Sequence, residues 1–229
     1  MFLTTLILGI SLISKALPAQ EKEKAFSQAQ KAFEVGFSYH EAGNLEKARE
    51  YYERAIAYDR TFVSAYINLG NIESQLLRYD IAENYYKIAI SLNPHHADAY
   101  YNLGALYQLQ EKYTLAIQNF EKTISLNNNY KQAYVNLATC YMRLYLKSYD
   151  RQLLKLARES LVTAGKIDRQ YGHVYFNLGM LYELENQPGL ALSHYRQALR
   201  YYDDSSPQQE KTRNRILYLE KKIAQEVAP

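Results

Sequence analysis

Four asparagines recur at regular spacing and could bind a peptide backbone. Asn68, Asn102 and Asn136 lie 34 residues apart, and Asn177 follows after a further 41. An asparagine amide both donates and accepts hydrogen bonds, so a row of them can hold the N–H and C=O groups of an extended peptide whatever its side chains. The same amides could instead bond locally between adjacent helices. The sequence leaves both roles open.

The segments around these asparagines are copies of one another. The sequence reads A-Y-I-N-L-G from Ala65, A-Y-Y-N-L-G from Ala99, A-Y-V-N-L-A from Ala133 and V-Y-F-N-L-G from Val174, with a degenerate copy, K-A-F-E-V-G, from Lys31. A fixed period of this size is typical of repeat proteins, in which each unit packs on its neighbours.

Each copy predicts two amphipathic helices. In the third copy Tyr100, Leu103, Gly104 and Tyr107 follow the i, i+3, i+4, i+7 spacing of one helical stripe. The stripe of a second helix follows after a short turn, at Tyr113, Ala116, Ile117, Phe120 and Ile124. Glycine costs a helix about 1 kcal/mol relative to alanine. We therefore expect Gly104, together with Ala116, to let the paired helices approach closely, as Ala89 and Ala198 would do in other copies.

These residues resemble the tetratricopeptide repeat (TPR) pattern, W/Y-x-x-L-G-x-x-Y…A-x-x-x-F/Y-x-x-A…P. The resemblance implies an all-α fold, a right-handed TPR α-solenoid of antiparallel helix pairs. The expected parts are a signal peptide or anchor at 1–19, a linker or helix start at 20–28, repeats at 29–62, 63–96, 97–130, 131–171 and 172–205, and a capping helix at 206–229.

The resemblance also implies a peptide-binding groove. In TPR proteins the face of each first helix that lies opposite its packing stripe lines a concave groove, where extended or helical peptides dock. Glu34 replaces asparagine in the first repeat, so the row has four members. The aromatic residues on this face could equally pack between adjacent first helices. The candidate groove residues are Asn68, Asn102, Asn136, Asn177, Phe33, Phe37, Ile67, Asn71, Tyr101, Phe176 and Met180.

Composition and motifs argue against other classes of function. With 27 Lys+Arg and 24 Asp+Glu the net charge is +3, too balanced to favour nucleic acid or a membrane surface. No phosphate loop, H-E-x-x-H motif or cysteine pair occurs, so we expect no catalytic residue, cofactor or metal. His95 and His96 follow a proline as turn residues, and Cys140 is expected to be a buried apolar residue. Phe33 and Ile67 stand where chaperone-binding TPRs carry lysine, so capture of a terminal carboxylate is not expected.

The first residues predict export. Phe2 to Ile13 is uncharged and apolar, close to the length of a signal-peptide core and shorter than the ~20 residues of a spanning helix. Cleavage near Ala16 or Ala19 would leave a periplasmic or secreted protein. A retained anchor is the alternative, and the membrane is expected to be contacted only through this segment.

Two departures from the repeat have structural predictions. The fourth repeat is seven residues longer, about two helical turns, which should lengthen both of its helices and leave a tip near Ser148 to Asp150. After the fifth repeat, Ser206, Pro207 and Gln209 predict a capping box at the start of a terminal helix. That helix carries an apolar stripe at Ile216, Leu219 and Ile223.

The function predicted from these patterns is a non-catalytic protein-interaction module. It would bind a peptide or helix of a partner protein in its groove, as an adaptor or assembly factor. The alternative is a homo-oligomeric scaffold whose groove is filled by self-association.

Overall fold

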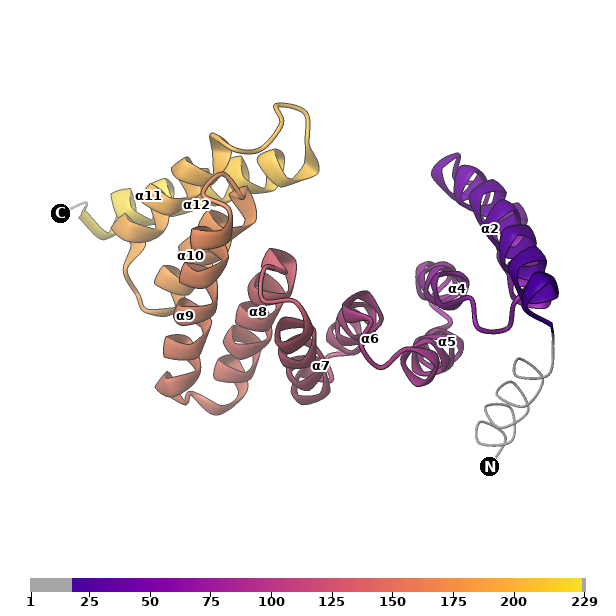
Figure 1. Ribbon diagram of the computed structural model, residues 1–229. Helices are drawn as coiled ribbons and strands as arrows, with labels where there is room; N and C mark the ends of the chain where they lie inside the picture. The colour runs from indigo at the N-terminus through magenta and orange to yellow at the C-terminus, as the bar shows by residue number, and fades with distance from the viewer. Residues whose placement is uncertain (1–17, 228–229) are drawn as a thin grey trace. The chain divides into compact units, whose positions relative to one another are not determined.

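The chain is built of helices throughout its described part. The computed structural model describes residues 18–227, which form eleven helices and no strand (Figure 1). The predicted all-α fold is confirmed. Two compact units divide the chain, residues 1–110 and 111–229, and each is described by itself. Residues 1–17, which hold nearly all of the predicted export segment, lie outside the described residues.

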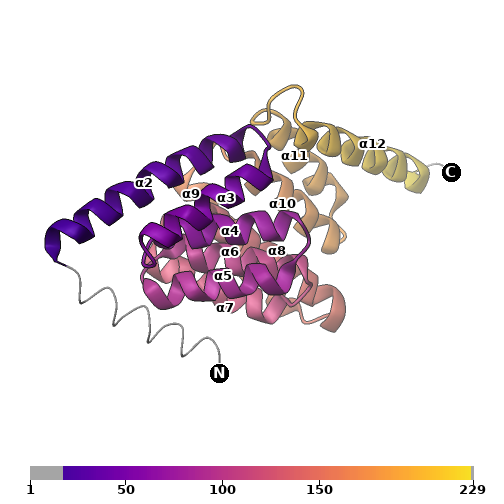
Figure 2. The same cartoon turned by 90° about the vertical axis from the view of Figure 1, so that its right-hand side faces the viewer.

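Unit 1 is a stack of antiparallel helix hairpins. It contains α2 (Ala19–Glu41), α3 (Leu45–Tyr58), α4 (Val63–Gln75), α5 (Tyr79–Leu92) and α6 (Ala97–Leu109). Helices α2 and α3 pair, as do α4 and α5, while α3 packs on α4 and α5 on α6. Because α2 begins at Ala19, residues 20–28 are helical, and Figure 2 shows this end of α2 extending past α3.

Unit 2 continues the same arrangement and ends in one extra helix. It contains α7 (Tyr113–Leu126), α8 (Lys131–Ser148), α9 (Arg151–Ile167), α10 (Gly172–Leu184), α11 (Pro188–Leu199) and α12 (Pro207–Val227). Helices α8 and α9 pair, as do α10 and α11, and α12 packs on α11. Among the residues described, no helix is both long enough and apolar enough to cross a membrane.

The turns between repeats have a common hydrogen bond. The residue that ends the second helix of a repeat is Asp59, Asn93, Asn127 or Asp168, and its side-chain oxygen accepts from the backbone N–H two residues later. The four N···O distances lie between 2.8 and 3.0 Å. Short polar side chains form such turns readily because they mimic a backbone acceptor. This bond directs the chain into the next repeat.

The longer fourth repeat is accommodated as predicted. Helix α8 has 18 residues against 13 in α4, α6 and α10, and α9 has 17 against 14 in α5 and α7. Tyr149 joins them with a left-handed backbone, φ 57°, and the side chain of Asp150 caps α9 by accepting from the backbone N–H of Gln152 at 2.9 Å. The tip is therefore two residues long.

The capping box of α12 is only half formed. Ser206 Oγ accepts from the backbone N–H of Gln209 at 3.2 Å, as predicted. The side chain of Gln209 does not return to Ser206. The backbone N–H of Ser206, which that side chain would accept from, donates to the backbone oxygen of Asp203 at 2.9 Å, and the Gln209 amide donates to Asp204 Oδ1 at 2.8 Å. Ile216 and Leu219 are buried and Ile223 packs beside them, as the stripe predicted.

Glycine in the first helix makes room for an aromatic ring in the second. A Cβ added at Gly70 would lie 2.5 Å from the ring of Tyr86, and one added at Gly179 would lie 2.6 Å from the ring of Tyr195. Real Cβ atoms essentially never approach other atoms this closely. The expected close approach is present in both hairpins, and the partner of the glycine is the aromatic residue of the stripe.

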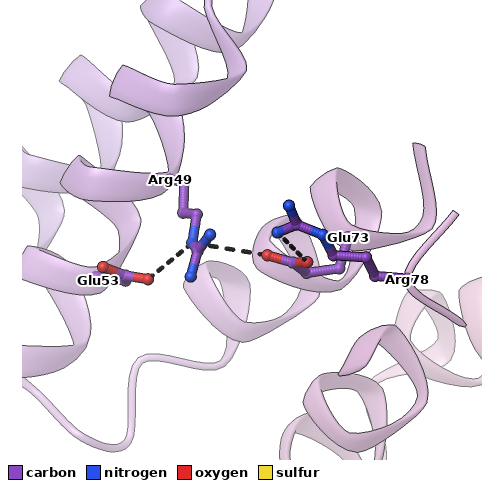
Figure 3. A network of polar contacts seen from close by, with 4 residues as sticks. All are labelled: Arg49, Glu53, Glu73 and Arg78. Carbon is purple, nitrogen blue, oxygen red and sulfur yellow. Dashed lines mark hydrogen bonds and ion pairs between the residues drawn. The ribbon is translucent and has the colours of Figure 1, made fainter. Parts of the chain in front are cut away.

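Unit 1 contains a buried ion-pair network. Glu73 of α4 is 1% exposed, and its carboxylate lies 3.6 Å from Arg49 of α3 and 3.3 Å from Arg78 in the turn before α5. Arg49 also pairs with Glu53 at 3.0 Å (Figure 3). Two arginines compensate one buried carboxylate, so the network ties three successive segments together.

Candidate functional site

An apolar hollow of unit 2 lies where α12 passes the first helices of the last two repeats. We call it the cap pocket. Its volume is about 570 Å³, within the range of small-molecule and peptide side-chain pockets. Figure 1 shows α8 in rose, α10 in orange and α12 in yellow. The lining residues are Thr139, Met142, Arg143, Leu146, Phe176, Met180, Glu183, Leu184, Tyr195, Lys211, Asn214, Arg215 and Tyr218.

The wall formed by α12 is held by both apolar and charged contacts. Ile216 and Leu219 are buried against α11, and a different side of α12 faces the pocket. Arg196 of α11 pairs with Glu220 of α12 at 2.7 Å. Helix α12 is therefore part of the site and also a cap on the last repeat.

One carboxylate on the pocket wall is fully engaged. Glu183 of α10 accepts hydrogen bonds from the Tyr195 hydroxyl and from the Arg215 guanidinium, whose Nε lies 2.6 Å from Oε1. Burial, followed by the bond to Glu183, raises the pKa of Tyr195 far above its ordinary value, so the hydroxyl remains a donor. The pair formed by Glu183 and Arg215 is neutral overall.

Two further cations line the pocket with no carboxylate partner among residues 18–227. Arg143 of α8 is exposed and makes no ion pair there. The Lys211 ammonium of α12 lies 5.2 Å from the ring centre of Phe176, a contact that leaves its charge uncompensated. The pocket therefore combines an apolar lining with a positive rim.

A second hollow, the side pocket, continues from the first. Its volume is about 350 Å³. It shares Thr139, Arg143, Phe176, Met180 and Lys211 with the cap pocket, so both cations stand where the two hollows meet. His173 lines the side pocket, and burial lowers its pKa, which keeps the ring neutral near pH 7.

Three of the predicted groove residues lie in these pockets. Phe176 and Met180 line both of them, and Asn177 lines the side pocket. Asn177 is 8% exposed; its amide donates to the backbone oxygen of His173 at 2.8 Å and accepts from the Thr139 hydroxyl at 3.1 Å. The bond to Thr139 joins α10 to α8 and the bond to His173 lies within α10, so the Asn177 amide is bonded locally.

In unit 1 the predicted asparagines also bond to neighbouring side chains. The amide of Asn68 donates to the Tyr52 hydroxyl at 3.2 Å, and Asn71 donates to Asn68 at 3.4 Å and accepts from the Tyr86 hydroxyl at 2.8 Å. The four residues form a continuous polar chain. It connects the first helix of the second repeat to the second helices on either side.

The remaining predicted residues differ in exposure. Ile67 is 6% exposed, and Phe33 packs on Phe62 with ring centres 5.4 Å apart, whereas Phe37 is 49% exposed. Tyr101 and Asn102 of α6 and Asn136 of α8 are all half-buried. Asn102 and Asn136 belong to different units, and peptide contact at these positions stays a prediction.

The sequence interpretation missed the contribution of α12. Lys211, Arg215 and Tyr218 follow the i, i+4, i+7 spacing of a second stripe on this helix, on a different side from the apolar one. Arg143 was missed too, although it lies seven residues after Asn136 and so on the same helical face. Residues 18–227 contain no group of His, Cys, Asp and Glu side chains able to hold a metal ion.

Comparison with known families and structures agrees with the repeat pattern. Family models described as tetratricopeptide repeats match residues 61–129 and 172–205, and a model described as a TPR repeat matches residues 36–76. A search of curated proteins gave no significant match.

Solved TPR structures share the fold at low sequence identity. The structure of pilF from Pseudomonas aeruginosa is 15% identical, with a TM-score of 0.70, and the match covers 90% of this chain and 93% of that one. MamA from Desulfovibrio magneticus RS-1 is 20% identical over 76% of this chain and 94% of its own, with a TM-score of 0.63. YrrB, described as a TPR protein with an unusual peptide-binding site, is 20% identical over 80% and 90%, with a TM-score of 0.57.

One assignment follows from three findings. These are the 34-residue period, the helix hairpins in which a glycine packs against an aromatic ring, and the matching family models. The chain belongs to the tetratricopeptide repeat family.

Proposed function

We propose that this chain is a non-catalytic protein-interaction module whose cap pocket binds apolar side chains from a peptide or helical segment of a partner protein. The observation that carries the proposal is the pocket itself, about 570 Å³ of largely apolar lining on the face that TPR proteins use for peptides. Leu146 and Tyr218 on its rim are 46% and 55% exposed, so apolar area is available to a ligand.

The side chains of the pocket suit a peptide. Met142 and Met180 line it, and methionine adapts its flexible side chain to irregular apolar ligands. Tyr218 offers an aromatic surface with little conformational entropy to lose, a property that enriches tyrosine at interfaces. The same fold carries a peptide-binding site in YrrB, which supports peptide as the class of ligand.

The wider role follows from the absence of recognisable catalytic motifs. A module of this kind would act as an adaptor or assembly factor for an exported partner, and the apolar segment of residues 2–13 supports export. Sequencing the N-terminus of the mature protein tests this part. A start near residue 17 or 20 is expected for a cleaved signal, and an intact Met1 on membrane-bound protein would replace it with a retained anchor.

Self-association is the second candidate and has its own observation. Phe26, Val35 and Phe37 of α2 are 51%, 39% and 49% exposed at the end of unit 1 that no capping helix covers within the described residues. Light scattering on the purified full chain separates the two candidates. A monomer at micromolar concentration opposes the scaffold, whereas a defined oligomer that dissociates on Phe37→Glu supports it.

Peptide selection tests the pocket directly. Phage-displayed 16-residue peptides are selected on the immobilised full chain, and their affinities are measured by fluorescence anisotropy. Met180→Arg places a charge in the apolar lining and should weaken the selected peptides by at least about tenfold. Leu190→Arg is the matched control, because Leu190 is 47% exposed on α11 and outside both pockets.

Circular dichroism melts establish that both variants are folded. Peptides that bind Leu190→Arg like the wild type and fail on folded Met180→Arg support the proposal. If no peptide is enriched, or if both variants bind equally, the pocket is not a peptide site.

A further inference from the structure

We propose that the cap pocket selects an acidic partner segment, one in which apolar side chains enter the pocket and carboxylates lie against Arg143 and Lys211. This inference rests on the proposed peptide-binding function and adds the chemistry of the ligand. It comes from the charges on the rim, which neither the repeat pattern nor the family match assigns.

The charge balance of the lining is positive. The two pockets together are lined by three cations, Arg143, Lys211 and Arg215, and by one carboxylate, Glu183. Glu183 is taken by Arg215 and by the Tyr195 hydroxyl. Two positive charges therefore face the hollows without a carboxylate partner from the described chain. His173 is neutral and adds no further positive charge.

The cations are placed to act together with the apolar lining. Arg143 comes from α8 and Lys211 from α12, with Phe176 and Met180 of α10 shared between the two hollows. A segment that fills the cap pocket with an apolar side chain brings its neighbouring residues to the junction where both cations stand. Arginine can bind a carboxylate through two parallel hydrogen bonds, and lysine adds a point charge.

The ion pair between Glu183 and Arg215 holds the Arg215 side chain in place at the rim of the pocket. Arg215 binds Glu183 through two nitrogens and lies over the Tyr218 ring at 5.0 Å, so its guanidinium is already engaged. It cannot serve the ligand without giving up these contacts. Binding of the acidic segment is therefore assigned to the two remaining cations.

The occupant is a partner segment with side-chain carboxylates next to apolar residues. A basic or neutral segment would leave both cations uncompensated as the pocket is covered, which opposes binding. Electrostatic attraction between partly exposed charges also weakens as salt increases. The inference thus predicts both a composition and a salt dependence.

The test uses the peptides selected on the full chain and a matched pair of charge variants. Arg143→Gln with Lys211→Gln removes the two rim cations and keeps similar side-chain size. Arg200→Gln with Lys221→Gln removes two exposed cations outside both pockets. We expect enrichment of Asp and Glu in the selected peptides and about fivefold weaker binding to the rim variant only, the sum of two partly exposed ion pairs.

Each peptide is also synthesised with Gln and Asn in place of Glu and Asp, and with a C-terminal amide in place of the acid. Loss of binding on side-chain neutralisation supports the acidic segment, and the difference between the charge variants should then vanish at about 1 M salt. Loss on amidation alone would assign the cations to a chain terminus and refute the acidic segment.

Other outcomes separate this inference from the proposed function. Suppose that the selected peptides fail to bind Met180→Arg but contain no excess of acidic residues, or that they bind the rim variant as tightly as the control variant. The acidic ligand is then refuted, and the pocket remains a peptide site. If no peptide is selected at all, the proposed function itself fails.

Discussion

Replacing Gly179 by alanine should destabilise unit 2 although alanine is the better helix former. The new Cβ would lie 2.6, 2.7 and 2.8 Å from three ring atoms of Tyr195, so the ring must move by about 0.8 Å to reach an ordinary contact of 3.4 Å. Tyr195 is fully buried and its hydroxyl is bonded to Glu183, which in turn holds Arg215 of α12. The ring therefore has little freedom to move.

The expected change in the free energy of unfolding is the balance of two unfavourable contributions and one favourable contribution. Overpacking a core site costs about 1–3 kcal/mol, and weakening a hydrogen bond to a charged group costs about 1.5–3 kcal/mol. The higher helix propensity of alanine offsets about 1 kcal/mol of this loss in stability. We expect Gly179→Ala to lower the free energy of unfolding by about 1.5–5 kcal/mol, which is large against the roughly 5–15 kcal/mol of a typical domain.

Urea unfolding followed by circular dichroism at 222 nm measures this change. Gly189→Ala is the matched control: it lies in the first turn of α11, and a Cβ there meets nothing within 4 Å, so it should be neutral or slightly stabilising. Tyr195→Leu combined with Gly179→Ala tests the cause, because the smaller side chain frees the space. The double variant should then lose less than the two single losses added together.

The contact between Gly179 and Tyr195 is refuted as the cause if Gly179→Ala is as stable as Gly189→Ala. Full additivity of Gly179→Ala and Tyr195→Leu would contradict it as well. Because Tyr195 lines the cap pocket, Gly179→Ala should also weaken the selected peptides.

Three further predictions follow from single sites. Arg49→Met with Arg78→Met leaves the Glu73 carboxylate buried without a partner, and should lower the free energy of unfolding of unit 1 by about 3–5 kcal/mol in urea. Glu73→Gln should lower it clearly less. Equal losses would contradict the network. Burial raises the pKa of the Cys140 thiol to about 12, so its contribution to stability is complete below about pH 9 and is lost as pH rises towards 12. Native protein at pH 8 should leave Cys140 unreacted with a thiol reagent that labels the urea-unfolded chain at once, and rapid native labelling would show the site to be open. Tyr149→Gly relieves a left-handed backbone, φ 57°, and should raise the unfolding free energy by about 1 kcal/mol; an unchanged value would mean that the turn is unstrained.

The repeat pattern was sufficient to predict the helices because spacing alone determines their packing. The stripe of Tyr66, Leu69 and Gly70 recurs after 34 residues in the third and fourth copies and after 41 in the fifth, and each copy buries the same face. The seven extra residues of the fourth repeat could be placed for the same reason, since only whole turns added to both helices keep the stripes facing. Helical period is thus a strong predictor in this family.

Side-chain partners were harder to predict, because they depend on which helix lies opposite. Asn177 is in the predicted row, yet its bond to Thr139 depends on the crossing of α8 and α10. The second stripe of α12 was not predicted, because only the packing of α12 turns Lys211 and Arg215 towards a pocket. Burial of Glu73 was likewise hidden, since its two arginines come from different repeats.

Methyl NMR of methionine tests the central claim most directly. The chain has three methionines, Met1, Met142 and Met180, and both internal ones line the cap pocket. Chain labelled with ¹³C at the methionine methyl groups is titrated with a selected acidic peptide, and Met142→Leu and Met180→Leu assign the signals. We predict that the Met142 and Met180 methyl signals shift in a saturable manner while that of Met1 stays in place. Unmoved Met142 and Met180 signals at a peptide concentration that saturates the anisotropy would contradict a peptide site in this pocket.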